Sequence, residues 1–306
     1  MSELYCWACD LSENTGEGRL ANLFIEEKKI HNHIKYISVK NIQIKNKNIL
    51  KFLNYKYLSP FIGIFFCWFF FLKKKQVAFI NYLPFWNIFL FMLLPPRTIF
   101  GPITGGANFR KDKINIIRKY IFPIFYKISE FFIYLRSKKI IYSTDLLKPY
   151  LNNKTIIKSD FNYIFNIKKK KINYVKNIDF LIYYRKHKNK ESFFPYKFIK
   201  KIISLNFRIN IVGDYLNYSS VINHGYINNK LLNRLLSRTN YTIASNENLY
   251  SIFTMECINN GVKIIINKNE KNKIKFYKKN FIAVDYNKIL NLESLRLSMN
   301  NPISHN

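Results

Sequence analysis

The chain has 306 residues, of which 48% are hydrophobic, and its 50 Lys and Arg against 18 Asp and Glu give a formal net charge of +32. This length favours two domains, and the apolar content excludes a wholly disordered chain. Three explanations fit the charge: a coding bias, because Lys, Asn and Ile are abundant in every segment; an anionic membrane surface; or nucleic acid. No RNA-binding signature or recognition-helix pattern stands out from the Lys background, which disfavours nucleic acid.

In the first half of the chain, strand-like apolar runs alternate with amphipathic helical runs, the pattern of a parallel sheet with crossover helices. A polar, acidic opening lacks the features of a secretory signal. The predicted strands are Tyr5–Ala8, Ile34–Val39, Val77–Asn81, Thr98–Phe100 and Ile140–Tyr142, and the predicted helices are Gly18–Glu27, Phe61–Leu72 and Ile114–Leu135, the last broken at Pro123.

The most apolar run, Phe61–Leu72, begins after Pro60 and spans 12 residues. As a helix it would be about 18 Å long, whereas the hydrocarbon core of a bilayer is roughly 30 Å thick. The sequence therefore predicts a buried helix, with a shallow membrane contact as the alternative. The cysteine pair Cys6 and Cys9 lacks a second pair to complete a zinc site, so we expect ordinary thiols.

A run of four lysines at 168–171 marks the expected domain boundary, which gives domains 1–167 and 168–306. After it the alternation restarts. Strands are predicted at Phe180–Tyr184, Ile209–Val212, Tyr241–Ala244 and Val262–Ile266, and helices at Tyr196–Leu205, Leu231–Leu236, Asn248–Asn260 and Leu290–Leu297. The predicted fold is α/β, with two Rossmann-like doubly wound domains facing a cleft.

Ligands of open parallel sheets bind at the carboxyl ends of the strands, so the residues that follow each strand are candidates. In the second domain these are Arg185, Lys186, Lys188 and Lys190, then Gly213 and Asp214, and then Ser245 to Asn248. Cations after one strand and the free N–H groups of a helix start after another would suit a diphosphate. A solvated lysine loop is the alternative for the individual lysines.

Glu256 continues the apolar stripe of Leu249, Ile252 and Phe253 on the predicted helix Asn248–Asn260. A carboxylate on a buried face needs a partner, since an isolated buried charge costs several kcal/mol. That partner is either one of the many lysines or a ligand. Glycines cluster at two other strand ends, Gly16 with Gly18 and Gly105 with Gly106, where they suit either ligand approach or plain turn geometry.

The order of these motifs resembles the retaining GT-B glycosyltransferases of group 1, or family 4. The resemblance is carried by Arg185 and Lys190 after a strand, by IVGD ending in Asp214, by the NHGY turn with Gly225, and by the helix with Glu256 followed by NGVKIII. In the first half, TGEGRLA and the GPITGG turn resemble the acceptor-side loops of that group. The similarity covers nearly the whole chain.

The resemblance implies that Arg185 and Lys190 neutralise a donor diphosphate and that Glu256 binds the ribose hydroxyls of the nucleotide. It implies no cofactor and no obligatory metal. The family places a second acid before Glu256 with seven intervening positions, and here that position is Asn248, with the acid at Glu247. Which of the two would contact the donor sugar stays open.

These expectations amount to an enzyme that transfers a sugar from a nucleotide-diphosphate sugar to a glycan or lipid-linked acceptor in surface polysaccharide or lipopolysaccharide synthesis. It would be cytoplasmic and peripheral on the inner membrane face, with the nucleotide sugar and the acceptor as partners and an anionic membrane surface as a candidate partner. The alternatives are a noncatalytic scaffold of the same fold in a polysaccharide assembly complex, and a nucleic-acid-binding protein.

Overall fold

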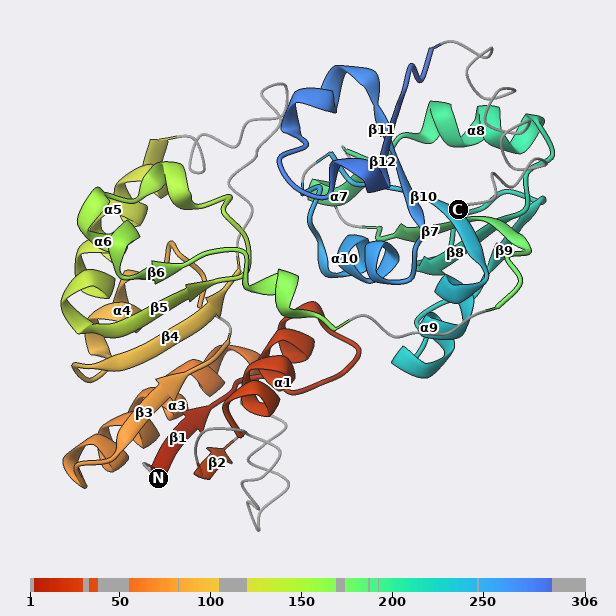
Figure 1. Cartoon of the computed structure of the whole chain (residues 1–306). Helices are drawn as coiled ribbons and strands as arrows, with labels where there is room; N and C mark the ends of the chain where they lie inside the picture. Colours follow the sequence, from red (N-terminus) through yellow and green to blue (C-terminus); the bar gives the residue numbers. More distant parts are fainter. Residues whose placement is uncertain are drawn as a thin grey trace. The chain divides into compact units, whose positions relative to one another are not determined.

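The computed structural model describes residues 3–29, 33–37, 55–81, 83–104, 120–168, 174–186, 188–191, 193–246 and 248–287. The chain forms two compact units, Met1–Asn166 and Ile167–Asn306 (Figure 1). Each unit contains one six-stranded sheet in which all pairings are parallel. Both sheets are doubly wound, which confirms the predicted α/β class with two Rossmann-like domains.

The sheet of the first unit has the strand order β2-β1-β3-β4-β5-β6. Its strands are β1 (Glu3–Trp7), β2 (His33–Ile37), β3 (Gln76–Phe79), β4 (Thr98–Ile103), β5 (Ser137–Tyr142) and β6 (Ser159–Asp160). The helices are α1 (Gly16–Lys29), α3 (Tyr55–Leu72), α4 (Ile88–Leu93), α5 (Phe122–Arg136) and α6 (Asn153–Ile157), with 3-10 turns at Lys148–Tyr150 and Tyr163–Asn166.

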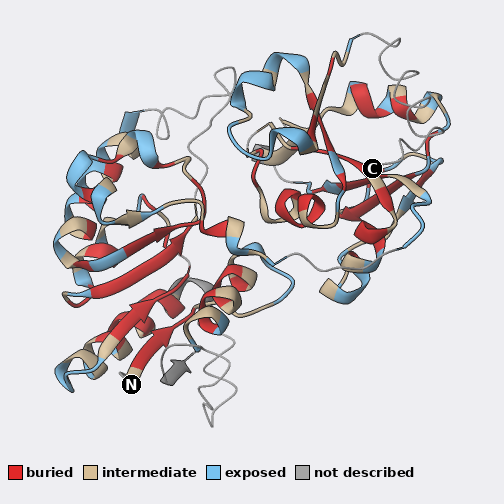
Figure 2. Ribbon diagram, viewed as in Figure 1, coloured by how far each residue is buried: buried red, intermediate tan, exposed pale blue. Residues whose placement is uncertain are grey.

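One hydrophobic core joins the first sheet to α3, α4 and α5. Its members include Trp7, Phe79 and Phe100 from the sheet, Cys67 from α3 and Phe91 from α4, all at most 3% exposed. Right-handed crossovers place α1 on the opposite face of the sheet. Figure 2 shows the strands as the most buried part of the unit and the outer sides of its helices as exposed.

The sheet of the second unit has the strand order β12-β11-β10-β7-β8-β9. Its strands are β7 (Ile178–Tyr184), β8 (Ile209–Gly213), β9 (Val221–Asn223), β10 (Thr239–Ile243), β11 (Lys263–Asn267) and β12 (Phe281–Val284). The helices are α7 (Lys188–Glu191), α8 (Tyr196–Ser204), α9 (Asn229–Ser237) and α10 (Ile252–Asn259), with 3-10 turns at Lys268–Lys273 and Lys278–Asn280.

Three sequence predictions about elements need correction. Helix α3 begins at Tyr55 and contains Pro60, so the proline does not mark its start although prolines often occupy the first helical turn. Helix α10 begins at Ile252 instead of Asn248. Helices α4, α6 and α7 and the short strands β6, β9 and β12 were not predicted. The predicted helix Leu290–Leu297 and residues 114–119 lie outside the described residues.

Candidate functional site

The second sheet reverses its winding direction between β7 and β10. From β7 the chain proceeds to β8 and β9 on one side, and it then returns to place β10 on the other side of β7. Open parallel sheets bind ligands at such a switch point, at the carboxyl ends of the two central strands. Arg185 follows β7, and Ser245 and α10 follow β10, so these predicted residues flank the switch point.

Asp214 ties the carboxyl ends of β7 and β8 together. Its carboxylate accepts a hydrogen bond from the backbone N–H of Lys186 at 2.7 Å and another from the Tyr226 hydroxyl at 2.8 Å. Its own N–H donates to the carbonyl of Tyr184 at 2.9 Å. Both carboxylate oxygens are thus engaged within the protein, and Asp214 fixes the backbone that presents Arg185.

Arg185 and Lys186 are exposed at this strand end. The pKa of the Tyr226 phenol is raised by burial and by its hydrogen bond to Asp214, whereas the nearby positive charge of Arg185 acts in the opposite direction. The guanidinium of Arg185 therefore lies close enough to the Tyr226 phenol to influence its pKa. Lys190, the second predicted phosphate contact, lies farther along the chain in the short helix α7 and is half-buried.

Two predicted glycines shape the same edge. Gly213 has a φ of +105°, and its N–H donates to the carbonyl of Gly225 at 2.9 Å. A Cβ atom on Gly213 would lie 2.2 Å from the carbonyl oxygen of Tyr184, whereas a Cβ on Gly225, with φ of +66°, would meet nothing within 4 Å. Gly213 is needed for both its conformation and its close packing, and Gly225 for its conformation alone.

The start of α10 lies beside the end of β7. Ser251 is the N-cap, and its hydroxyl accepts a hydrogen bond from the N–H of Thr254 at 3.2 Å. The ring of Phe253 in the first turn packs against Tyr183 of β7, with ring centroids 5.7 Å apart. Asn248 lies before the helix in a turn, where its side-chain oxygen accepts from the N–H of Tyr250.

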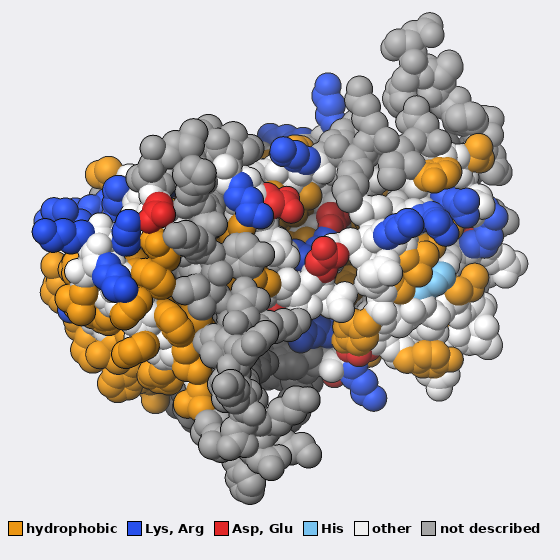
Figure 3. Space-filling model, turned by 90° about the horizontal axis from the view of Figure 1, so that it is seen from below, with side chains coloured by type: hydrophobic (Ala, Val, Ile, Leu, Met, Phe, Trp, Pro, Cys, Tyr) orange, Lys and Arg blue, Asp and Glu red, His pale blue; other side chains and the backbone are white. Residues whose placement is uncertain are grey.

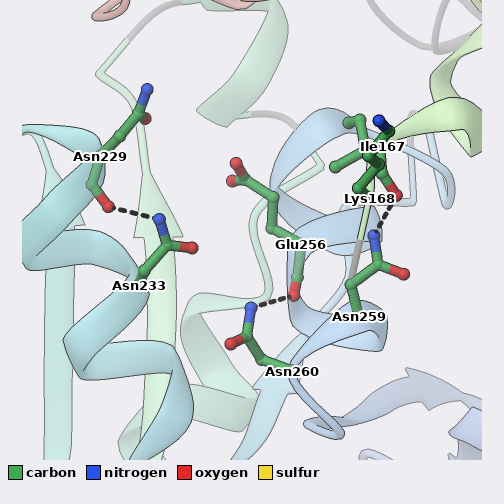
Figure 4. A pocket seen from close by; sticks show the side chains of 7 residues that line it. All are labelled: Ile167, Lys168, Asn229, Asn233, Glu256, Asn259 and Asn260. Carbon is green, nitrogen blue, oxygen red and sulfur yellow. Dashed lines mark hydrogen bonds between the residues drawn. The ribbon is translucent and has the colours of Figure 1, made fainter. Parts of the chain in front are cut away.

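Glu256 lines a pocket of about 80 Å³ beside α10. The residue is 7% exposed, and in Figure 4 its carboxylate extends into the space between α9 and the segment that precedes β7. All but one of the side chains that line the pocket are polar or charged; the lining residues are Ile167, Lys168, Asn229, Asn233, Glu256, Asn259 and Asn260. Such a pocket suits a small polyhydroxylated group.

Three of the asparagines that line the pocket are fixed by hydrogen bonds from their side-chain amides to backbone carbonyls. The Asn260 side chain donates to the carbonyl of Glu256 at 2.8 Å, and the Asn233 side chain donates to the carbonyl of Asn229 at 2.7 Å. The Asn259 side chain donates to the carbonyl of Ile167, also at 2.7 Å, and this bond fixes the segment that precedes β7 against α10. The sequence marks Lys168 only as the start of the lysine run at the domain boundary, and it does not single out Asn229 or Asn233.

The predicted site residues of the second unit do not all lie together. Glu256 lines the pocket, whereas Arg185, Gly213 and Asp214 lie at the carboxyl ends of β7 and β8, Gly225 follows β9 and Lys190 lies on α7, all outside the residues that line the pocket. Asn248 precedes α10 without lining the pocket. Glu247, Gly105 and Gly106 lie outside the described residues.

The first sheet has its own switch point between β1 and β3, with a hydrogen-bonded loop at its carboxyl edge. Asp10 accepts from the N–H of Ser12 at 2.7 Å, and its own N–H donates to the side chain of Asn81, which is 1% exposed. Thr104 donates to Glu17 at 3.2 Å, linking the end of β4 to α1. Neither Asp10 nor Asn81 could be identified as a candidate site residue from the sequence, because neither belongs to a motif.

Gly16 and Gly18 lie in the first turn of α1, directly after this loop. The N–H of Gly18 donates to the Thr15 hydroxyl at 3.0 Å. A Cβ on Gly18 would lie 2.3 Å from the backbone oxygen of Ser12. Gly18 therefore serves close packing of the loop on the helix, and neither glycine is among those with positive φ.

The cysteines carry no sign of redox or metal chemistry within the described residues. All four are free thiols. Burial raises the pKa of Cys6 to about 12 and that of Cys9 to about 11, so neither forms a reactive thiolate near neutral pH. Among the described residues, no three His, Cys, Asp or Glu side chains lie close enough together to hold a metal ion.

Ser251→Ala should lower the free energy of unfolding by about 1 kcal/mol, because the first turn of α10 loses its side-chain acceptor. Chemical denaturation of both proteins measures the difference. Asn228→Ala, which removes the equivalent acceptor at the start of α9, is a matched control of similar cost. An unchanged midpoint for Ser251→Ala alone would show that the cap does not stabilise α10.

Comparison with known proteins gives no match to any protein-family model and none to the curated sequences. Solved structures do match. A protein described as a UDP-N-acetylglucosamine 2-epimerase from Listeria monocytogenes aligns over 98% of this chain and 88% of its own, with a TM-score of 0.55 and 8% identity. S. aureus MnaA in a structure with UDP aligns over 98% and 89%, with a TM-score of 0.52 and 10% identity.

An alpha-glucosyltransferase in complex with UDP-glucose and DNA containing an abasic site aligns over 97% of this chain and 90% of its own, with a TM-score of 0.56 and 12% identity. At such low identities the likeness concerns the fold. The chain has the GT-B fold, two Rossmann-like domains in one polypeptide, which these epimerases and glycosyltransferases share.

Proposed function

We propose that this chain is a glycosyltransferase that uses a nucleotide-diphosphate sugar as donor. The observation that carries the proposal is the position of Glu256. Its carboxylate is buried in a small polar pocket, on the helix that follows the central strand β10 at the switch point of the second sheet. Ribose hydroxyls are natural ligands for such a carboxylate, since hydrogen bonds to a charged acceptor are each worth roughly 1.5–3 kcal/mol.

The pocket volume limits what it can hold. Its volume of about 80 Å³ is well below the ~300 Å³ of ordinary small-molecule sites, so it would hold the ribose and leave the diphosphate outside. Arg185, at the end of the neighbouring strand β7, would then grip phosphate oxygens through its planar fork of N–H donors. Lys190 on α7 would add a second positive charge.

Glycosyl transfer suits this arrangement. The bond between the anomeric carbon and the diphosphate oxygen breaks with the electron pair leaving on the diphosphate, and positive charge develops on the sugar. The acceptor hydroxyl oxygen forms the new bond to the anomeric carbon, and its proton passes to the departing diphosphate. Fixed cations at the phosphates stabilise that charge separation and so lower the barrier. We propose transfer with retention of anomeric configuration to a glycan or lipid-linked acceptor in surface polysaccharide or lipopolysaccharide synthesis, with the first unit as the acceptor-binding unit.

A nucleotide screen followed by product analysis tests the proposal. Thermal shift against ribonucleoside diphosphates and their sugars should show stabilisation, about 2.7 kcal/mol at a hundred times the dissociation constant. A transferase then releases the nucleoside diphosphate only when acceptor is present. Recovery of a nucleotide sugar with altered stereochemistry would indicate an epimerase, and the absence of any nucleotide binding would indicate a noncatalytic scaffold.

Arg185→Ala should weaken binding of a nucleoside diphosphate roughly 10- to 100-fold, because a charge-assisted bond to phosphate is lost. Binding of the free nucleoside should not change. Arg208→Ala is the matched control: Arg208 lies on the same unit at the amino end of β8, where it pairs with Asp179 at 3.6 Å. Calorimetry of the three proteins measures the affinities. Equal diphosphate affinity in all three would remove Arg185 from the site.

A further inference from the structure

Helix α3 exposes a row of large apolar side chains. Phe61, Phe65, Phe69 and Leu72 are 50%, 68%, 42% and 73% exposed, and their spacing of four, four and three residues places them on one side of the helix. The opposite side carries Cys67, which belongs to the core. Exposing such a row to water is unfavourable, so the row is unusual on a helix that already buries its other face.

The neighbouring helices extend the same surface. Phe89 and Leu93 of α4 are 64% and 42% exposed, and Phe131 and Leu135 of α5 are 57% and 56% exposed. The three helices are adjacent: the Trp68 indole of α3 donates to the carbonyl of Leu93 at 2.6 Å. Between α4 and α5, the Trp86 ring stacks on Phe122 with centroids 6.0 Å apart.

Figure 3 shows hydrophobic side chains gathered over part of the first unit, with Lys and Arg side chains nearby. We call the exposed apolar side chains of α3, α4 and α5 the α3–α5 face. No described helix is long and apolar enough to cross a membrane.

Among the described residues, α3, α4 and α5 carry no exposed acid. The sequence from Tyr55 to Thr104 contains no Asp or Glu. The one acid of α5, Glu130, is 7% exposed and accepts hydrogen bonds from the N–H of Asn152 and the hydroxyl of Thr155. The Glu130 carboxylate is therefore buried and hydrogen-bonded within the first unit, and it adds no negative charge to the exposed surface of α5.

Cations lie after α3 and α4 and within α5. Lys73 follows α3, and its ammonium lies 4.0 Å from the centre of the Phe69 ring. Lys74 and Arg97 are also exposed, after α3 and α4 respectively, as is Lys127 within α5. An apolar face whose three described helices bear exposed cations and no exposed acid fits a surface that presents hydrocarbon together with negative charge.

We infer that the α3–α5 face docks on an anionic lipid bilayer, with its aromatic side chains in the interfacial region and its lysines at the lipid phosphates. A second copy of this chain would bring the same cations to the contact without acids to balance them, so the charge opposes self-association through this face. The inference does not depend on the proposed function, because none of these residues lies in the second unit.

Vesicle sedimentation of the full chain tests the inference. The protein should bind vesicles of phosphatidylcholine mixed with phosphatidylglycerol and bind pure phosphatidylcholine much more weakly. The double variant Phe65→Glu with Phe131→Glu should partition at least about tenfold less onto the anionic vesicles, since burial of each ring is replaced by a carboxylate. Ile222→Glu, at a residue 56% exposed on the second unit, should bind like the unmodified chain.

Two further measurements make the result decisive. Thermal unfolding and nucleotide-induced stabilisation should be the same in all variants, because the altered side chains are exposed and lie outside the nucleotide site. Equal vesicle binding by the double variant would overturn the inference. So would sedimentation in solution that shows a dimer of the unmodified chain and a monomer of the double variant, because the face would then be an interface between copies.

Discussion

Glu256→Gln is expected to weaken binding of a ribonucleotide roughly 10- to 100-fold, because hydrogen bonds from ribose hydroxyls to a charged carboxylate become bonds to a neutral amide. The substitution keeps the size of the side chain in its pocket of about 80 Å³, so packing is preserved. Calorimetric titration with the best nucleotide from the thermal-shift screen measures the change.

Comparing the affinities of the same variant for a ribonucleotide and for its 2′-deoxy form is a sharper test. The unmodified chain should prefer the ribonucleotide, and Glu256→Gln should lose much of that preference, because the affinity for the deoxy form depends less on the carboxylate. Glu270→Gln provides the matched control, since Glu270 is a half-buried acid of the same unit that is paired with Lys273 and does not line the pocket. If Glu256→Gln kept the full preference for the ribonucleotide, another residue would have to recognise the sugar.

The strands that carry the candidate site could be predicted because they are long apolar runs. Strands β7, β8, β10 and β11 each have at least five residues, and each was predicted to within two residues at either end. By contrast, the unpredicted strands β6, β9 and β12 have two to four residues. Strands that short at or near the edge of a sheet show no recognisable period and form because a neighbouring strand is already in place.

The start of α10 was misplaced because two residues can act as a cap. Both Asn248 and Ser251 are residue types favoured before a helix. Asn248 instead closes a turn on the N–H of Tyr250 at 3.0 Å, and Ser251 caps the helix. The sequence shows both capabilities and does not decide between them, because the choice depends on how Tyr250 packs against Phe281, with ring centroids 5.9 Å apart.

The pocket around Glu256 was only partly predictable for a related reason. The buried acid was visible from the helical stripe, and the structure shows it 7% exposed. Its neighbours Lys168, Asn229 and Asn233 come from segments far from Glu256 in the chain. Asn and Lys are so abundant here that no single one stands out, and only the arrangement of α9, α10 and the segment before β7 brings these together.

Gly213→Ala is expected to lower the free energy of unfolding by about 2–4 kcal/mol. Two costs combine: a φ of +105° is unfavourable for any residue with a Cβ, and the added atom would lie 2.2 Å from the carbonyl oxygen of Tyr184. The strand end cannot relax freely, because Asp214 N–H donates to that same carbonyl at 2.9 Å. Urea denaturation of the full chain measures the loss.

Gly225→Ala separates the two costs. This glycine also has positive φ, at +66°, but a Cβ there would meet nothing within 4 Å, so only the conformational cost of about 1–2 kcal/mol applies. The difference between the two variants therefore isolates the contact with the end of β7. Because that contact holds the backbone presenting Arg185, Gly213→Ala should also weaken diphosphate binding, whereas Gly225→Ala should leave it nearly unchanged. Equal losses of stability in the two variants would show that the β7 and β8 ends are not packed as closely as the structure indicates.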